Sequence, residues 1–382
     1  MGGCLKRSRK DKIAAMLKKP SIISMKRPLL FAILSLLLTS LACRAAEQVV
    51  FGTPTPTPSP FPSATPTFTP TLTPSPTPTA TSTLSFEETC PDGDCIEACL
   101  EGLGLDLVNE SQYSHRDPNF KGSSGQILVS YAVYGDKLIE EEKKAVYSTF
   151  KSYQEDIDLH QRIWDYYRAI IPAKNRTTIT NFLVFTDGKQ NILAYVAQSR
   201  ISPEKWVISV DVVDAETPQD LTYTLVHEFA HLLTLGPDQV IPSEPIFDNP
   251  GDEKIWRSEF DSCETYFPGE GCSIADAYIE TFFTNYWEEI YREWIRIQHQ
   301  PDKDSYIESI QEFYEEYQDR FVTEYAVTSP EEDIAESFTF FVLTKKTEAN
   351  KISDQKVLFF YDYPELVLLR LNIIEGICSY NR

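Results

Sequence analysis

Three residues in the sequence His227-Glu228-Phe229-Ala230-His231 predict the chemistry of this chain most directly. Residues four apart share one face of a helix, so His227 and His231 can present two imidazole nitrogens to one ion about 2.0–2.1 Å away. Glu228 lies one residue past the first of them, off the metal but beside its open coordination position. There it can accept a proton from a zinc-bound water, whose pKa the metal lowers toward about 7. The pattern predicts a zinc centre with Glu228 as the general base.

A zinc site of this kind needs a third protein ligand. Position 237 is proline, so a third histidine ten residues after the first is absent. The best candidate is Glu332, in an acidic helix start, and Glu336 shares its helix face. Glu336 would accept the second ring N–H of a ligand histidine and fix its tautomer. An alternative remains, because Ser329 and Glu332 also fit a capping box with Pro330 at the first helical position.

The residues around this motif predict the elements that position it. Residues 221–235 are largely apolar apart from their threonines and the three motif residues, which predicts a buried helix whose polar groups need partners. Strands are predicted at 181–185, 192–198 and 206–213, the first two joined as a hairpin through Thr186-Asp187-Gly188-Lys189. One long helix is expected over 137–171. Further helices are expected at about 273–299, 304–322, 331–346 and 364–376, after a loop-rich stretch from 236.

Two short segments together resemble a known family. His227-Glu228-Phe229-Ala230-His231, with a later Tyr325, six residues, and then Glu332-x-x-Ala335-Glu336-x-Phe338, resembles the gluzincin metallopeptidases, among them the catalytic domain of anthrax lethal factor and the secreted proline-specific endopeptidases. The resemblance implies that His227, His231 and Glu332 bind zinc and that Glu228 is the base. It also implies that Tyr325 stabilises the oxyanion of a tetrahedral intermediate.

The spacing departs from that family. His231 and Glu332 are 101 residues apart, which is longer than those relatives usually show, and the insertion would form a lid or a specificity wall. In the family pattern a substrate lies as an extra strand along the sheet edge, which here would come from residues 192–213. Within the insertion, Cys263 and Cys272 flank a short loop rich in turn residues, and we expect them to form a disulfide.

The N-terminal part predicts export. A short basic region and an apolar run over residues 29–41 resemble an export signal. The run ends in Thr39-Ser40-Leu41-Ala42-Cys43, which resembles a bacterial lipobox and predicts lipidation of Cys43. Cleavage near residues 45–46, or an uncleaved anchor, are the alternatives. Residues 53–84 are nearly all Thr, Pro and Ser with ten prolines and no charge, which is typical of an extended stalk.

These patterns divide the chain into four parts. We expect an export segment at 1–44, a stalk at 45–89, a cysteine-bearing lead-in at 90–124 and a zincin-like metallopeptidase domain at 125–382. The expected fold class of that domain is α+β, with a small mixed sheet and a mostly helical C-terminal half.

Charge narrows the partners of this domain. Residues 1–44 hold ten of the 35 Lys and Arg and one of the 57 Asp and Glu, so 25 basic and 56 acidic residues follow, a balance of −31. This argues against nucleic acid and against charge-driven adsorption to a membrane. We expect a monomer at the outer face of the cell membrane, held there only by its N-terminal lipid or anchor, that binds one Zn²⁺ and a polypeptide substrate.

Two rival interpretations remain. The first is a catalytically silent surface protein that uses the zincin fold for binding; the presence of Glu228 and Tyr325 argues against it, because a pure binder needs neither. The second is a structural surface protein whose histidines pack without metal. The chain contains only five histidines, so a chance pairing at this spacing is rare.

Overall fold

A computed structural model describes residues 99–100, 125–188 and 192–380 of the chain. The expected export segment with Cys43, the stalk, and the lead-in apart from Cys99 and Leu100 lie outside the described residues. Among the helices that are described, none is both long and apolar enough to cross a membrane.

Five strands form the main sheet, in the order β2-β1-β3-β5-β4, and two short strands, β6 and β7, pair separately. Strands β3 and β5 are parallel and the other pairs are antiparallel, so the sheet is mixed, as the sequence predicted. The strands are β1 (Gln126–Tyr134), β2 (Lys137–Lys143), β3 (Ile179–Thr186), β4 (Ala194–Gln198), β5 (Trp206–Asp211), β6 (Val240–Pro242) and β7 (Gly271–Ser273).

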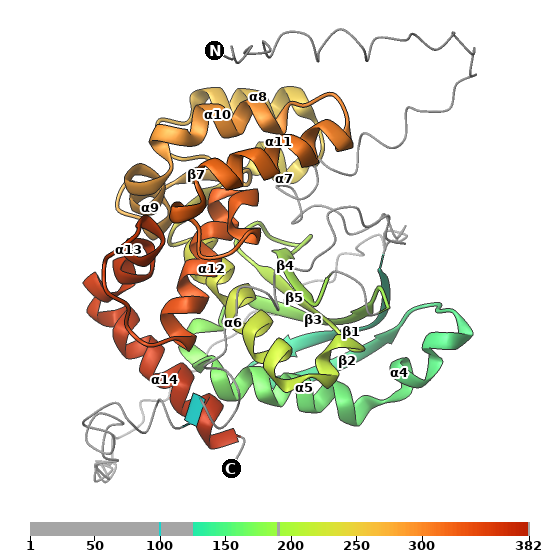
Figure 1. The fold of residues 1–382 in the computed structure, drawn as a ribbon. Coiled ribbons are helices and arrows are strands. Elements are labelled where there is room, and N and C mark those ends of the chain that lie inside the picture. Colours follow the sequence, from blue (N-terminus) through green and yellow to red (C-terminus); the bar gives the residue numbers. More distant parts are fainter. Residues whose placement is uncertain (1–98, 101–124, 189–191, 381–382) are drawn as a thin grey trace, which may run out of the picture.

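Helices make up most of the remaining fold, and those of the C-terminal half, orange to red in Figure 1, lie together on the side away from β1 and β2. The α-helices are α4 (Lys151–Glu155), α5 (Ile157–Ile170), α6 (Pro218–Leu235), α7 (Glu244–Asp248), α8 (Glu253–Ser262), α9 (Tyr278–Tyr286), α10 (Glu288–Gln298), α11 (Lys303–Glu316), α12 (Pro330–Leu343), α13 (Ile352–Phe359) and α14 (Pro364–Tyr380). The 3-10 turns are η4 (Ser148–Phe150), η5 (Ala173–Asn175), η6 (Asp214–Glu216), η7 (Gln318–Arg320), η8 (Tyr325–Thr328) and η9 (Phe360–Asp362). The expected α+β class with a mostly helical C-terminal half is confirmed.

The prediction of one long helix over 137–171 is wrong: its first part is not helical, and its second part is divided into η4, α4 and α5. Residues 137–143 form strand β2, which pairs with β1 across the two-residue turn Gly135-Asp136. Gly135 has φ of 59°, the left-handed conformation that such a turn requires. The apolar spacing of the segment fits a helix, but pairing with β1, a strand that the sequence analysis missed, decides its structure.

The predicted hairpin between the strands at 181–185 and 192–198 is also wrong. Strand β5 lies between β3 and β4 and pairs with both of them. Asp211, at the end of β5, holds the connection: its side chain accepts a hydrogen bond from the Asp187 amide at 2.8 Å, and its own amide donates to the Leu193 carbonyl at 2.7 Å. Residues 187–188 therefore lead out of the sheet instead of back along β3.

The helix predictions after residue 220 have mixed outcomes. Helix α6 confirms the predicted buried helix at 221–235, and α12 and α14 lie where helices were expected. The helix predicted at 273–299 is two helices, α9 and α10, that meet at Trp287, and the one predicted at 304–322 ends at Glu316. Helix α13 was missed, and the stretch expected to be loop-rich contains α7, α8 and both short strands.

Two cysteine pairs lie at disulfide distance. Cys263 and Cys272 are paired as the sequence predicted. Cys99 pairs with Cys378 and so ties the lead-in to α14, a pairing that the sequence left open.

Candidate metal centre

Helix α6 places the three motif residues inside the protein. It begins with Pro218 at its first position and ends at Leu235, with Gly236 as the C-cap residue. Most of its residues are buried, since it is covered both by the sheet and by the C-terminal helices. His227, Glu228 and His231 are 3%, 6% and 8% exposed, so each needs a polar or metal partner to offset the cost of its burial.

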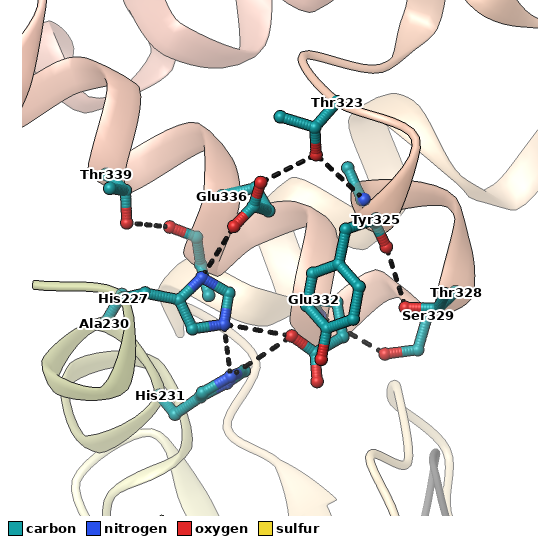
Figure 2. A network of polar contacts seen from close by, with 12 residues as sticks. His227, Ala230, His231, Thr323, Tyr325, Thr328, Ser329, Glu332, Glu336 and Thr339 are labelled. Atoms are coloured by element: carbon teal, nitrogen blue, oxygen red, sulfur yellow. Dashed lines mark hydrogen bonds and ion pairs between the residues drawn. The ribbon is translucent and has the colours of Figure 1, made fainter. Parts of the chain in front are cut away.

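Helix α12 supplies the facing carboxylate. Ser329 caps this helix by accepting a hydrogen bond from the Glu332 amide at 3.2 Å, and Pro330 follows at the first helical position. The Glu332 carboxylate points toward α6, with Oε2 3.0 Å from Nε2 of His227 and 3.4 Å from Nε2 of His231. The helix cap is therefore present, but it comes from Ser329, while the Glu332 side chain faces the two histidines (Figure 2).

The separations of these three atoms fit one metal ion. The two histidine Nε2 atoms are 3.2 Å apart, so the three distances in the group lie between 3.0 and 3.4 Å. Ligand atoms about 2.0–2.1 Å from a tetrahedral ion are about 3.3–3.4 Å from one another. His227, His231 and Glu332 thus form a buried group that could hold a metal ion.

Glu336 lies one turn further along α12, against the other side of His227. Its Oε1 is 2.8 Å from Nδ1 of His227, so Figure 2 shows this ring between Glu336 and Glu332. Its Oε2 accepts hydrogen bonds from the Tyr223 hydroxyl at 2.7 Å and the Thr323 hydroxyl at 2.6 Å. With a proton on Nδ1 directed at Glu336, the ring turns the lone pair of Nε2 toward the centre.

Sequence reasoning missed Tyr223 and Thr323. Tyr223 precedes His227 by four residues on α6 and so shares its helix face, a spacing that could have identified it. Thr323 lies in the segment before η8, and no local pattern predicts that it contacts Glu336.

Electrostatics at the centre favour a cation. Burial by itself lowers the pKa of His227, but the hydrogen bonds and charges of Glu332 and Glu336 outweigh it and raise that pKa to about 10. Burial likewise raises the pKa of Glu332, yet His231 and His227 outweigh it and hold that pKa well below its usual range. The field that retains a proton on His227 equally favours a metal ion among the three converging atoms.

The other two predicted site residues flank this group. Glu228 is buried next to His227 on α6 and is not one of the three converging residues. Tyr325 begins η8, just before α12, and the centroid of its ring lies 5.9 Å from that of His227. The structure thus brings together five residues of the predicted site from two helices and the turn that precedes the second, and Glu228 follows the first of them on α6.

Comparison of the chain with protein-family models, curated proteins and solved structures found no match.

Proposed function

We propose that this chain is an exported zinc metalloendopeptidase with a zincin-like domain. The observation that carries the proposal is the convergence of His227, His231 and Glu332, with 3.0–3.4 Å between their ligand atoms; Glu228, the residue after His227 on α6, is buried as well. Two histidines and one carboxylate are a ligand set that catalytic zinc sites use, because it leaves a coordination position for water or substrate.

A zinc ion in this position would supply a Lewis acid that lowers the pKa of water and polarises a peptide carbonyl. In the proposed reaction, Glu228 accepts a proton from the attacking water and later delivers it to the leaving amine, so the carboxylate is regenerated. Tyr325 donates a hydrogen bond to the developing oxyanion. Glu336 keeps His227 in the tautomer whose Nε2 faces the centre.

An extended polypeptide is the proposed substrate. Strand β4 is one edge of the five-stranded sheet, and it lies in contact with α6. The predicted edge at 192–213 is thereby narrowed to β4, because β5 is paired on both sides. An edge strand offers unpaired backbone N–H and C=O groups, to which a peptide can add as a further strand beside the metal helix.

The test starts from purified wild-type protein refolded with zinc. We expect one zinc per chain by metal analysis and cleavage of a peptide library. Glu228→Gln should keep its zinc and lose about 10²- to 10⁴-fold in kcat/KM, because only the proton acceptor is lost. Glu253→Gln is the matched control, since that side chain is 87% exposed and lies outside the site.

The outcomes separate the three interpretations. If the wild-type protein binds no zinc, both metal-dependent hypotheses, the metalloendopeptidase and the catalytically silent binding protein, are contradicted. The structural surface protein is then favoured. Zinc without cleavage favours the catalytically silent binding protein. Unchanged cleavage by Glu228→Gln removes Glu228 from the mechanism.

We also propose that Cys43 is lipidated and holds the domain at the outer face of the membrane. The basis is the sequence alone, in the apolar run and lipobox-like residues that precede Cys43. Cys43→Ser should move the protein from the membrane fraction to the medium, and mass spectrometry of the wild-type N-terminus should find a lipid on Cys43.

A further inference from the structure

The insertion between the two ligand-bearing helices contains a loop closed by the Cys263–Cys272 pair, residues 263–272, here called the disulfide loop. Tyr266 lies in this loop and is 5% exposed. Its hydroxyl donates a hydrogen bond to Oε1 of Glu331 at 2.5 Å. Glu331 is the second residue of α12 and the immediate neighbour of Glu332, so this hydrogen bond joins the disulfide loop to the helix turn that carries Glu332.

Tyr266 is itself held on several sides. Its amide donates to Oε2 of Glu280 at 2.6 Å, and its carbonyl accepts from the Ser273 amide at 2.9 Å. Its ring stacks on Phe283, with centroids 4.2 Å apart, and meets the edge of Tyr291 at 5.9 Å. These contacts fix the place from which the hydroxyl reaches Glu331.

The other end of the disulfide loop is tied to α6. Strand β6 follows α6 after a short turn, in which the Val240 amide donates to the Gly236 carbonyl at 2.9 Å. Strand β6 pairs with β7, which contains Cys272. Gly271 permits this close pairing, because a Cβ there would lie 1.9 Å from the Ile241 carbonyl oxygen. A continuous path of contacts therefore runs from the end of α6, through the disulfide loop, to the start of α12.

The first turn of α12 is where such a connection has the largest effect. Further along, α12 is held against α6 by Glu336 at His227 and by Phe338, whose ring centroid is 6.2 Å from that of Phe229. Helix ends fray more readily than helix interiors, and Glu332 is only the third residue of its helix. Small displacements of that turn would move the carboxylate away from the two histidine nitrogens.

We propose that Tyr266 is a positioning residue for the metal centre: through Glu331 it holds the first turn of α12, and with it the Glu332 carboxylate, at a fixed distance from His227 and His231. The insertion thus acts as a brace between the two helices that carry the ligands. This inference rests on the proposed function, because it takes Glu332 as a zinc ligand.

The experiment measures zinc affinity of the purified chain by competition with a chromophoric chelator. Tyr266→Phe, which removes only the hydroxyl, should weaken zinc binding about tenfold, the lower end of the effect of groups that orient metal ligands. Glu331→Ala should weaken it equally, and the double variant should be no weaker than either single one, because both remove the same contact. Glu331→Gln should stay within about twofold of wild type, since its amide oxygen still accepts the hydrogen bond.

Tyr278→Phe is the matched control, because it also removes a hydrogen bond from a tyrosine to a glutamate, here Glu365 of α14 at 2.8 Å. It should bind zinc as wild type does, and an equal loss in this variant would overturn the inference.

Thermal unfolding of the zinc-free variants completes the test. If Tyr266→Phe lowers the unfolding temperature but binds zinc with wild-type affinity, Tyr266 only stabilises the fold and the inference is overturned, while the proposed function stands. If the wild-type chain binds no zinc, the proposed function fails, and the inference fails with it.

Discussion

Helix α12 carries two buried charged clusters that differ in how their charges are matched. One is the candidate metal centre, in which Glu332 and Glu336 face His227 and His231. The other surrounds Asp333, which directly follows Glu332 in the sequence. Asp333 and Lys356 of α13 form an ion pair in which both side chains are fully buried.

The Asp333 cluster has its counter-charge within the protein. Trp287 donates a hydrogen bond to Oδ2 of Asp333 at 2.7 Å, and the Lys356 ammonium lies 4.4 Å from the centroid of the Phe321 ring. One negative and one positive charge therefore meet in an apolar, aromatic surrounding. This arrangement needs no further ion, and its role is to join α12 to α13 and to the junction of α9 and α10.

The candidate metal centre is not balanced in this way. Two carboxylates, Glu332 and Glu336, face two imidazole rings. The three nearest ligand atoms converge on one point instead of pairing with a lysine or arginine. Neighbouring residues of one helix thus differ: Asp333 has its counter-ion in the chain, and Glu332 belongs to a group that could hold a metal ion.

The largest difference between the two clusters is expected in the zinc content of Glu332→Gln. The amide keeps the size of the side chain but removes the charge that a zinc ligand supplies, so zinc should fall from one per chain to a small fraction. Asp333→Asn, on the same turn of α12, is the matched control and should retain zinc. Metal analysis after gel filtration distinguishes the two, and retention of zinc by Glu332→Gln would assign the third ligand elsewhere.

The second cluster can be broken by Lys356→Met. Removing one partner leaves Asp333 buried without its counter-ion, which should lower the free energy of unfolding by about 3–5 kcal/mol. Urea unfolding measures this loss, and metal analysis should still find zinc in the folded variant. Lys346→Met is the control, because that exposed ammonium, 4.3 Å from the Tyr361 ring centroid, should contribute less than about 1 kcal/mol. Joint loss of zinc and stability would show that the two clusters are not independent.

The sequence predicts those features of the fold that depend on neighbouring residues better than those that depend on residues far apart in the chain. Helix α6 and the start of α12 were predicted because their evidence is local: an apolar stretch with two histidines four apart, and Ser329-Pro330 at a helix start. The segments at 181–185 and 192–198 both have clear strand composition. Whether they pair with each other depends on β5, which pairs with both of them instead. The composition of either segment alone does not show which strand it will pair with.

The candidate site divides in the same way. His227, Glu228 and His231 follow from spacing alone, whereas Glu332, 101 residues after His231, was selected partly by resemblance. The Asp333–Lys356 pair was not predicted, because a lysine on an amphipathic helix is normally solvated and only the packing of α13 buries this one. Tyr266 was one of twenty tyrosines, and its contact with Glu331 exists only once the insertion is folded.

A smaller effect on zinc affinity is expected from Glu336→Gln. This change leaves all three converging atoms in place but weakens the acceptor at Nδ1 of His227, so zinc binding should weaken by about 10- to 100-fold. Chelator competition gives the dissociation constant. The comparison with Glu332→Gln is decisive, because a complete loss of zinc in Glu336→Gln and a mild loss in Glu332→Gln would exchange the roles assigned to the two carboxylates.

A last prediction concerns pH and the metal-free protein. Burial lowers the pKa of His227, but Glu332 and Glu336 outweigh it and raise that pKa to about 10 in the folded state, against about 6.5 for an unfolded histidine. The folded state therefore binds this proton more tightly, and the resulting stability is fully present below about pH 6.5 and is lost as the pH rises through about 10.

Urea unfolding of the chelator-treated wild type and of His227→Asn, between pH 6 and 10, should show a difference in stability that shrinks as the pH rises. With zinc bound, the metal takes the place of the proton on Nε2 of His227. Loss of that proton should then no longer lower the stability of the wild type between pH 6 and 10. The same decline in both forms would mean that the metal does not bind at His227. If stability declines with rising pH only in the metal-free form, the metal replaces the proton at His227. The charges of this cluster would then be matched by the metal, whereas Asp333 is matched by Lys356.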